Sequence, residues 1–216
     1  GNEGVAGAVP FMGGNWSGIV KPAHADHLQR SSYCGSGFNR ALADAGVLDI
    51  HPHPYPQLAG LIRAARIRAD VVMVQVSPPN AAGDYSLGLS AEYLVPALEI
   101  CRTVIGEVND QIPWTYSEKL LRKEDFALLV ESSRQPVTLP YGPPGDLEKA
   151  IARNAVPFVP EGATIETGLG ALPDAVLGML GDRKRLAIHS GSLGDGAVEL
   201  MERDIALQAN CGTLMG

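Results

Sequence analysis

Residues 163–180 read ATIETGLGALPDAVLGML, and residues 186–202 read LAIHSGSLGDGAVELME. Each stretch is a short apolar or β-branched run, then a glycine turn, then an amphipathic run. This order predicts a strand that leaves through glycines into a helix, which makes each stretch one βα unit. Such a turn offers unpaired backbone N–H groups to an anion or an acyl oxygen. The two stretches therefore predict an α/β fold with a binding site at their turns.

The same alternation extends upstream. Apolar runs predict strands over residues 70–76, 103–108 and 126–130, and helical spacing predicts helices over 38–45, 57–66, 90–102 and 147–158. Because the run DVVMVQV at 70–76 is almost continuously apolar, we expect a parallel strand covered on both faces. The pattern predicts a mainly parallel open sheet with helices on both faces.

Domain organisation follows from a change in composition. Residues 1–56 are rich in Gly, Pro and His without a strong period, and we interpret them as the start of the domain. Residues 57–216 are predicted to form the α/β domain, with a Pro-rich connector at 132–145. The chain begins at Gly1 and ends at Gly216 without completing an element, so we expect a part of a longer polypeptide or one subunit of a split one.

Composition excludes several classes of protein. With 216 residues, 45% hydrophobic and 19% charged, the chain is globular. The net charge of −7 and the absence of a basic run longer than residues 183–185 argue against nucleic-acid and membrane-surface partners. Cys34, Cys101 and Cys211 are scattered, which predicts free thiols in a reducing compartment, the cytoplasm. There is no signal-peptide pattern and no apolar run of the roughly 18–20 residues that span a bilayer.

Polar or glycine-rich residues follow four of the predicted strands. Since ligands of open parallel sheets bind beyond the carboxyl ends of the strands, we expect these positions to line one crevice. The candidates for substrate binding are Ser77, Pro78, Asn109, Gly168, Gly170, His189 and Gly191. Each has a plainer interpretation: Ser-Pro and Asn close strands by turn chemistry, the glycines only tighten a turn, and the histidine is a structural hydrogen-bonder.

Glu166 is the carboxylate that enters the first glycine turn, and it is the candidate catalytic residue. Its alternative is a solvent-facing strand position. His51 and His53 are spaced for a metal, but no acidic residue is adjacent in the HPHPYP stretch, so no metal site is predicted. No Walker-type phosphate loop and no GxGxxG pattern is present.

Three stretches resemble a known family. ADVVMVQVSPPNAAGDYSLGLSAEYLVPALEICRTVIGEVNDQIPWT (69–115), EGATIETGLGALPDAVLGML (161–180) and LAIHSGSLGDGAVEL (186–200) are similar to motifs of the acetyl-CoA hydrolase/transferase family, which includes 4-hydroxybutyrate CoA-transferase. The resemblance covers about residues 30–205. It implies an α/β fold of the class I CoA-transferase kind, a CoA-thioester substrate and no metal. It also implies that a C-terminal CoA-binding half is absent here, so we expect an oligomer or a companion half.

The chain departs from the family's motifs at four positions. The resemblance places the family's nucleophilic glutamate at Gly191, and the Gln before the GxG turn corresponds to Glu166. The Asp and His that follow the family's Ser-Pro-Pro correspond to Asn80 and Ala82. Because glycine has no nucleophilic group, transfer through a glutamyl thioester at Gly191 is in question.

Three functions remain open from the sequence. The leading one is a CoA-thioester enzyme, either an acyl-CoA hydrolase or a CoA-transferase acting on a small carboxylic acid. For hydrolysis Glu166 is the candidate base. For transfer, either Glu166 or a carboxylate of the absent half replaces the nucleophile, or the acyl exchange proceeds directly. The second is a catalytically impaired subunit that binds acyl-CoA or a partner. The third, a sugar-phosphate isomerase-like enzyme, rests on fold analogy alone.

Overall fold

A computed structural model describes residues 9–13, 17–117, 119–138 and 142–211. The chain divides into two compact units, Gly1–Leu139 and Pro140–Met215. The division falls within the Pro-rich connector at 132–145. The first unit therefore holds the Gly/Pro-rich segment 1–56 together with part of residues 57–216, which we had predicted to be a single domain.

The first unit opens with a small parallel sheet of order β1-β2-β3, formed by Phe11–Met12, Ser31–Ser32 and Asp49–Ile50. Short helices connect these strands and lead out of the sheet. They are η1 (Pro22–His24), η2 (Gly37–Asn39), α1 (Arg40–Asp44), η3 (Tyr55–Gln57) and α2 (Leu58–Arg63). Helices were predicted over 38–45 and 57–66, and both predictions are confirmed. The three strands were missed because two residues are too few to show a period.

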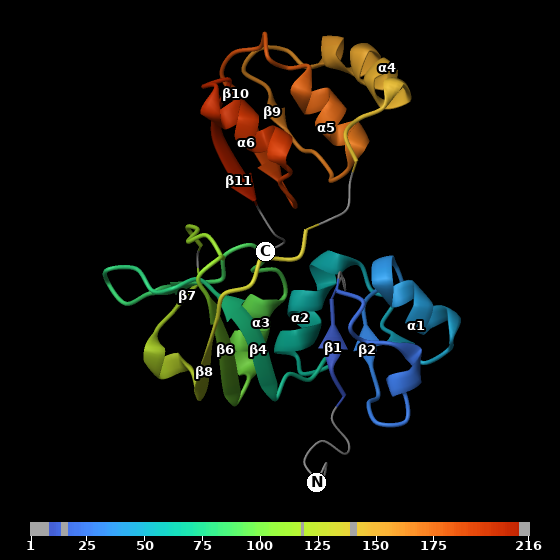
Figure 1. Cartoon of the computed structure of the whole chain (residues 1–216), viewed down its shortest axis with the longest axis vertical. Helices are drawn as coiled ribbons and strands as arrows, with labels where there is room; N and C mark the ends of the chain where they lie inside the picture. Colours follow the sequence, from blue (N-terminus) through green and yellow to red (C-terminus); the bar gives the residue numbers. More distant parts are fainter. Residues whose placement is uncertain (1–8, 14–16, 118, 139–141, 212–216) are drawn as a thin grey trace. The chain divides into compact units, whose positions relative to one another are not determined.

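A second parallel sheet, of order β4-β6-β8, forms the centre of the first unit (Figure 1). Its strands are Val71–Val76, Thr103–Asn109 and Leu128–Ser132, and α3 (Leu94–Ile100) connects the first two. All three predicted strands are confirmed, the last one two residues later than expected. An antiparallel pair, β5 (Tyr85–Ser86) and β7 (Leu120–Leu121), and η4 (Lys123–Asp125) lie in the connections.

One face of the β4-β6-β8 sheet is exposed. Val72, Val74 and Val76 are buried, whereas Val71 and Met73 are 52% and 74% exposed. The register places Met73 opposite Ile105 and Ile105 opposite Leu128, which is 54% exposed. The prediction that residues 70–76 are covered on both faces is therefore wrong for the described residues, because the side chains alternate along the strand and only one set is packed.

The second unit is a two-layer α/β arrangement of its own. It contains α4 (Asp146–Ala155), η5 (Val156–Phe158), β9 (Thr164–Ile165), α5 (Ala171–Gly178), β10 (Leu186–Ser190), α6 (Asp195–Glu202) and β11 (Ala206–Cys211). The sheet is parallel, of order β11-β10-β9. Leu177 of α5 and Leu200 of α6 pack with Leu186 and Ile188 of β10 in one core, so both helices cover the same face (Figure 1).

The predicted α/β class with parallel strands and connecting helices is confirmed, and both C-terminal stretches fold as βα units. The single open sheet is not observed, since the described parallel strands divide into three sheets. Cys34 and Cys101 are free thiols, while the side chain of Cys211 lies outside the described set. None of the described helices is both long and apolar enough to cross a membrane.

Gly106 in the central strand β6 gives a test of this packing. A Cβ added there would lie 2.7 Å from Phe126 ring carbons and 2.8 Å from Leu129 Cδ2. Gly106→Ala is therefore expected to lower the free energy of unfolding by about 1–3 kcal/mol. Urea denaturation measures the change. The matched control is Gly60→Ala in α2, where a Cβ meets nothing within 4 Å and stability should rise by about 0.5–1 kcal/mol. Equal losses in the two variants would contradict the packing.

Candidate functional site

The first glycine turn joins β9 to α5. After Ile165 the chain passes through Thr167, Gly168 and Gly170, and the helix begins at Ala171. Gly170 has φ 122° and ψ 174°, a conformation that is essentially restricted to glycine. Its carbonyl accepts a hydrogen bond from Asp174 N at 3.1 Å, which forms the first turn of the helix. The turn therefore needs glycine at position 170 because of its backbone conformation. This requirement holds whether or not a ligand approaches the turn.

The second glycine turn joins β10 to α6. The strand ends at Ser190, and Gly191 to Gly194 lead into the helix, which begins at Asp195. Gly194 O accepts a hydrogen bond from Ala197 N at 3.0 Å. Gly191 is exposed, and a Cβ built on it would meet no atom within 4 Å. Position 191 therefore has room for a side chain, although glycine occupies it.

A buried serine holds the two turns together. The Ser190 side chain is 2% exposed. Its hydroxyl donates to the carbonyl of Thr167 and accepts a hydrogen bond from Thr167 N at 3.2 Å. Ser190 was not among the predicted residues. The signal for it was available, since a polar residue that alternates with Leu186 and Ile188 along a strand lies on their buried face.

The helix after the first turn carries a carboxylate toward the second turn. The Asp174 side chain is half-buried, and its Oδ1 lies 3.1 Å from the position of a Cβ added to Gly194. The Leu169 side chain lies 3.9 Å from the same position. Gly194 thus allows the two turns to approach, with the carboxylate between them. Sequence reasoning missed Asp174, because an acid in the first turn of a helix is also a common stabiliser of the helix dipole.

Glu166 and His189 both lie at these turns and are exposed. Glu166 follows the last residue of β9, as predicted. His189 lies in β10 between the buried residues Ile188 and Ser190, so its side chain points to the sheet face opposite α5 and α6. The second unit therefore contains Glu166 and four other predicted site residues: Gly168, Gly170, His189 and Gly191. Their roles in catalysis and binding stay predictions.

The remaining predicted residues belong to the first unit. Ser77 follows β4, and it is fully buried. Its hydroxyl donates to the Pro78 carbonyl at 2.9 Å and accepts from Ser86 N at 3.2 Å. These bonds attach β5 to the end of β4, which is the turn-closing role considered from the sequence. Contact of Ser77 and Pro78 with a substrate stays a prediction.

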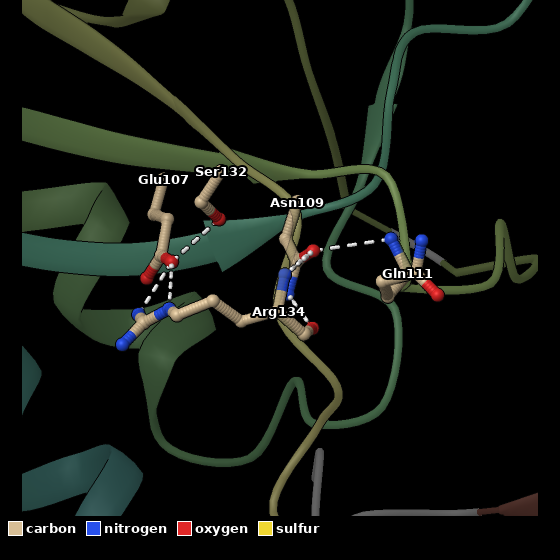
Figure 2. Close-up of polar contacts among 5 residues, drawn as sticks. All are labelled: Glu107, Asn109, Gln111, Ser132 and Arg134. Carbon is tan, nitrogen blue, oxygen red and sulfur yellow. Dashed lines mark hydrogen bonds and ion pairs between the residues drawn. The ribbon is translucent and has the colours of Figure 1, made fainter.

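Asn109 has a similar role at the end of β6 (Figure 2). Its Nδ2 donates to the Arg134 carbonyl at 2.8 Å, and its Oδ1 accepts from Gln111 N at 3.1 Å and Arg134 N at 3.2 Å. The side chain is fully buried. Asn109 thus joins two loops, and its amide is already occupied by the protein. Its predicted contact with a substrate stays a prediction.

A carboxylate lies beside this loop and is ionised more readily than usual. Ser132 Oγ donates to Glu107 Oε1 at 2.7 Å, and the guanidinium of Arg134 pairs with the same oxygen (Figure 2). The hydrogen bond from Ser132, together with those from Arg134, lowers the pKa of Glu107. Glu107 and Asn109 of β6 both bond to Arg134, so they hold the loop after β8 to the end of β6.

The structure corrects one expectation about the site. The four strand ends were expected on one sheet, but β4 and β6 belong to the β4-β6-β8 sheet of the first unit and β9 and β10 to the β11-β10-β9 sheet of the second. In the part of the chain that the structure describes, no cluster of three or more His, Cys, Asp or Glu is arranged to hold a metal ion. His51 Nε2 lies 3.9 Å from Asp49 Oδ2.

Comparison with known proteins adds to this geometry. The 4-hydroxybutyrate coenzyme A transferase of Clostridium kluyveri is 35% identical over 179 residues, which make up 83% of this chain. The solved structure of a 4-hydroxybutyrate CoA-transferase from Porphyromonas gingivalis matches with a TM-score of 0.71 and 27% identity over 93% of this chain. The chain belongs to the 4-hydroxybutyrate CoA-transferase family. It corresponds to the N-terminal part of these proteins.

The fold of this chain is also similar to that of RipA from Yersinia pestis, with a TM-score of 0.86 and 27% identity over 92% of this chain. No protein-family model matches the chain. The chain spans 42% of the length of the Clostridium kluyveri transferase, 48% of the RipA chain and 54% of the Porphyromonas gingivalis chain. Roughly half of each of these proteins therefore has no counterpart in this chain.

The two glycines of the TGLG turn provide a matched test. Gly170→Ala is expected to lower the free energy of unfolding by about 1–3 kcal/mol, because alanine is strained at φ 122°. Gly168→Ala should change it by less than about 0.5 kcal/mol, since an added Cβ meets only Pro173 Cγ, at 3.9 Å. Chemical denaturation measures both. A larger loss for Gly168→Ala than for Gly170→Ala would contradict this description of the turn.

The Glu107 cluster predicts a dependence of stability on pH. Since the folded-state pKa of Glu107 lies below its unfolded value of about 4.3, its contribution is fully present above that value and is lost as the pH falls through the folded pKa. Glu107→Gln should lower the free energy of unfolding by about 1 kcal/mol at pH 7 and by less at about pH 3. Urea denaturation at both pH values tests this, with the exposed Glu131→Gln as control. An effect that does not change with pH would contradict it.

Proposed function

We propose that this chain forms part of a CoA-transferase that moves CoA between an acyl-CoA and a small carboxylic acid. The observation that carries the proposal is the match of 83% of the chain to a CoA-transferase at 35% identity. The two adjoining glycine turns support it. Such a reaction needs a thioester carbonyl held beside hydrogen-bond donors and a carboxylate within reach, and both kinds of group occur at these turns.

The first turn supplies the donors in this proposal. The first backbone N–H groups of an α-helix have no acceptor within the helix, so those at the start of α5 are available to a bound oxygen. A thioester oxygen bound there gains negative charge when the carbonyl carbon is attacked, and the donors stabilise that charge. The glycine conformation at 170 sets the direction of these groups, so the backbone path of the turn is part of the proposed site.

Glu166 is the proposed nucleophile for transfer. Its carboxylate oxygen attacks the thioester carbonyl, the C–S bond breaks, and CoA leaves as the thiolate. The thiolate then attacks the glutamyl carbonyl, which releases the acyl group as a carboxylate and leaves CoA on the enzyme as a thioester. The acceptor carboxylate reverses these two steps and takes up the CoA. Atoms and charge balance without a metal or a redox partner.

Hydrolysis is the second candidate. In that case Glu166 acts as a base that takes a proton from water, and the resulting hydroxide attacks the same carbonyl. The glycine at position 191 supports hydrolysis as an alternative, because the resemblance places the family's nucleophilic glutamate at this position. The same glycine supports the third candidate, a subunit that binds acyl-CoA or a partner without turnover.

The substrate and its partners are part of the proposal. The ligands would be CoA thioesters and a small carboxylate, with no metal required, and the compartment would be the cytoplasm. Since the relatives are about twice as long as this chain, a companion half would supply the rest of the CoA site.

Trapping of the covalent intermediate distinguishes the three candidates. The assembly is incubated with acetyl-CoA, quenched with hydroxylamine and analysed by peptide mass spectrometry. A hydroxamate on Glu166 supports transfer, whereas release of CoA and acetate without any adduct supports hydrolysis. Binding of acetyl-CoA by calorimetry without turnover supports the binding subunit. If acetyl-CoA and longer acyl-CoAs neither bind nor react, the proposed function is wrong.

Position 191 gives a further prediction. Because a side chain has open space there, Gly191→Glu is expected to fold normally and to raise the rate of CoA transfer by roughly tenfold or more, with a hydroxamate now found at residue 191. Gly191→Gln has nearly the same size but no nucleophile, and it should give neither effect. If both variants behave alike, position 191 does not face the reacting carbonyl.

A further inference from the structure

The exposed face of the β4-β6-β8 sheet is an apolar surface. Val71 and Met73 of β4 and Leu128 and Val130 of β8 are between 49% and 74% exposed. The strand register places Ile105 of β6 between Met73 and Leu128 on the same face. These five side chains form one continuous apolar patch.

The first unit supplies a helical layer for the opposite face of this sheet. The helix α3 connects β4 to β6, and its buried residues include Val95 and Ala97. The connection from β6 to β8 contains β7 and η4 but no α-helix among its described residues. Parallel sheets occur almost only with both faces covered, because their crossover connections place helices on the faces. The apolar patch is therefore a face of the kind that a second layer of helix normally covers.

Ion pairs border the apolar patch at both ends of the strands. At the amino ends, Arg102 Nη2 lies 3.1 Å from Asp70 Oδ1. At the carboxyl ends, the guanidinium of Arg134 pairs with Glu107 (Figure 2). Each cation has an acidic partner, so these borders add no net charge. An apolar centre with a polar border is typical of an interface between polypeptides.

The size of the face indicates which kind of polypeptide covers it. Three strands about 4.8 Å apart, each with five residues at about 3.3 Å, form a face of roughly 14 by 16 Å. An α-helix of about 11 residues is about 16 Å long and about 10 Å wide, so one helix fits along the strands. Independent partners usually bury about 800 Å² each, which is several times this area. The patch is thus too small for a stable dimer of this chain by itself, and it suits one helix of a larger shared fold.

We propose that a helix of the companion half packs along the strands on the apolar patch. The companion half is the polypeptide that the relatives contain and that has no counterpart here, roughly half of each of them. The apolar stripe of the helix lies on the five patch residues, and its polar face is directed away from the sheet. The inference rests on the companion half of the proposed function, but not on the CoA chemistry, so assembly is measured without turnover.

The direct test is assembly from two chains. The part of the Clostridium kluyveri transferase that has no counterpart here is co-expressed with the whole chain, and the complex is measured by sedimentation velocity. Met73→Lys should weaken the complex at least roughly tenfold, because it places a charge within an apolar contact. The control Ile19→Lys changes a 69% exposed residue of the same unit outside this sheet, and it should leave the complex unchanged. Absence of a complex with the wild type, or equal effects of the two variants, overturns the proposal.

Thiol labelling gives a second readout that needs no separate companion chain. Met73→Cys in this chain, and cysteine at the aligned position of the whole Clostridium kluyveri transferase, are reacted with N-ethylmaleimide and followed by peptide mass spectrometry. Labelling should be at least roughly tenfold slower in the whole transferase. The control Lys123→Cys, at an exposed position of η4, should react at similar rates in both proteins. Equal rates at position 73 overturn the proposal, whatever the activity of the assembly.

Sedimentation of the chain alone tests the other occupant, a second copy. We expect the wild-type chain to show no association through the apolar patch. A dimer that Met73→Lys abolishes and Ile19→Lys does not would place a second copy on the patch and overturn the proposal. Turnover separates this result from the proposed function: an assembly that forms through the patch but neither binds nor converts acetyl-CoA contradicts only the function.

Discussion

The hydrogen bonds of buried polar side chains at strand ends organise this chain. A buried hydroxyl or amide must find a partner, because an unmet donor or acceptor costs about 1–3 kcal/mol. The side chain of Ser190 forms hydrogen bonds with Thr167, that of Asn109 with Arg134, and that of Ser77 with Ser86. In each case the partner is the main chain of another segment: the loop after β9 for Ser190, the loop after β8 for Asn109 and strand β5 for Ser77. The strand ends are therefore tied to loops by side chains, and the turns that could bind a ligand are held in place as a consequence.

The sequence predicted the longer elements well, because their periods are visible over several turns or strand residues. The strands at 71–76, 103–109 and 186–190 and the helices after both glycine turns lie where they were expected. The two-residue strands of the first unit, such as Phe11–Met12, carry no period and were missed. The grouping of strands into three sheets was also missed, since pairing between distant segments leaves no local pattern in the sequence.

The bonds that the predicted site residues make could not be read from the sequence. Gly168, Gly170, His189 and Gly191 belong to the second unit, and their place in a binding site stays a prediction. Ser77 and Asn109 were chosen correctly as strand-end residues, yet their polar atoms are engaged within the first unit. Ser190 and Asp174 were missed, because burial and the contact between two turns depend on how helices pack on the sheet. Sequence spacing alone does not contain that information.

A Cβ added at Gly191 would meet no atom within 4 Å. Its backbone conformation is one that other residues also adopt, unlike that of Gly170. Glycine and glutamate codons can differ by a single nucleotide. A side chain at position 191 could thus be lost or gained in one mutational step without loss of the fold. The architecture of the turn makes the residue at this position easy to change on an evolutionary timescale, while the scaffold around it stays the same.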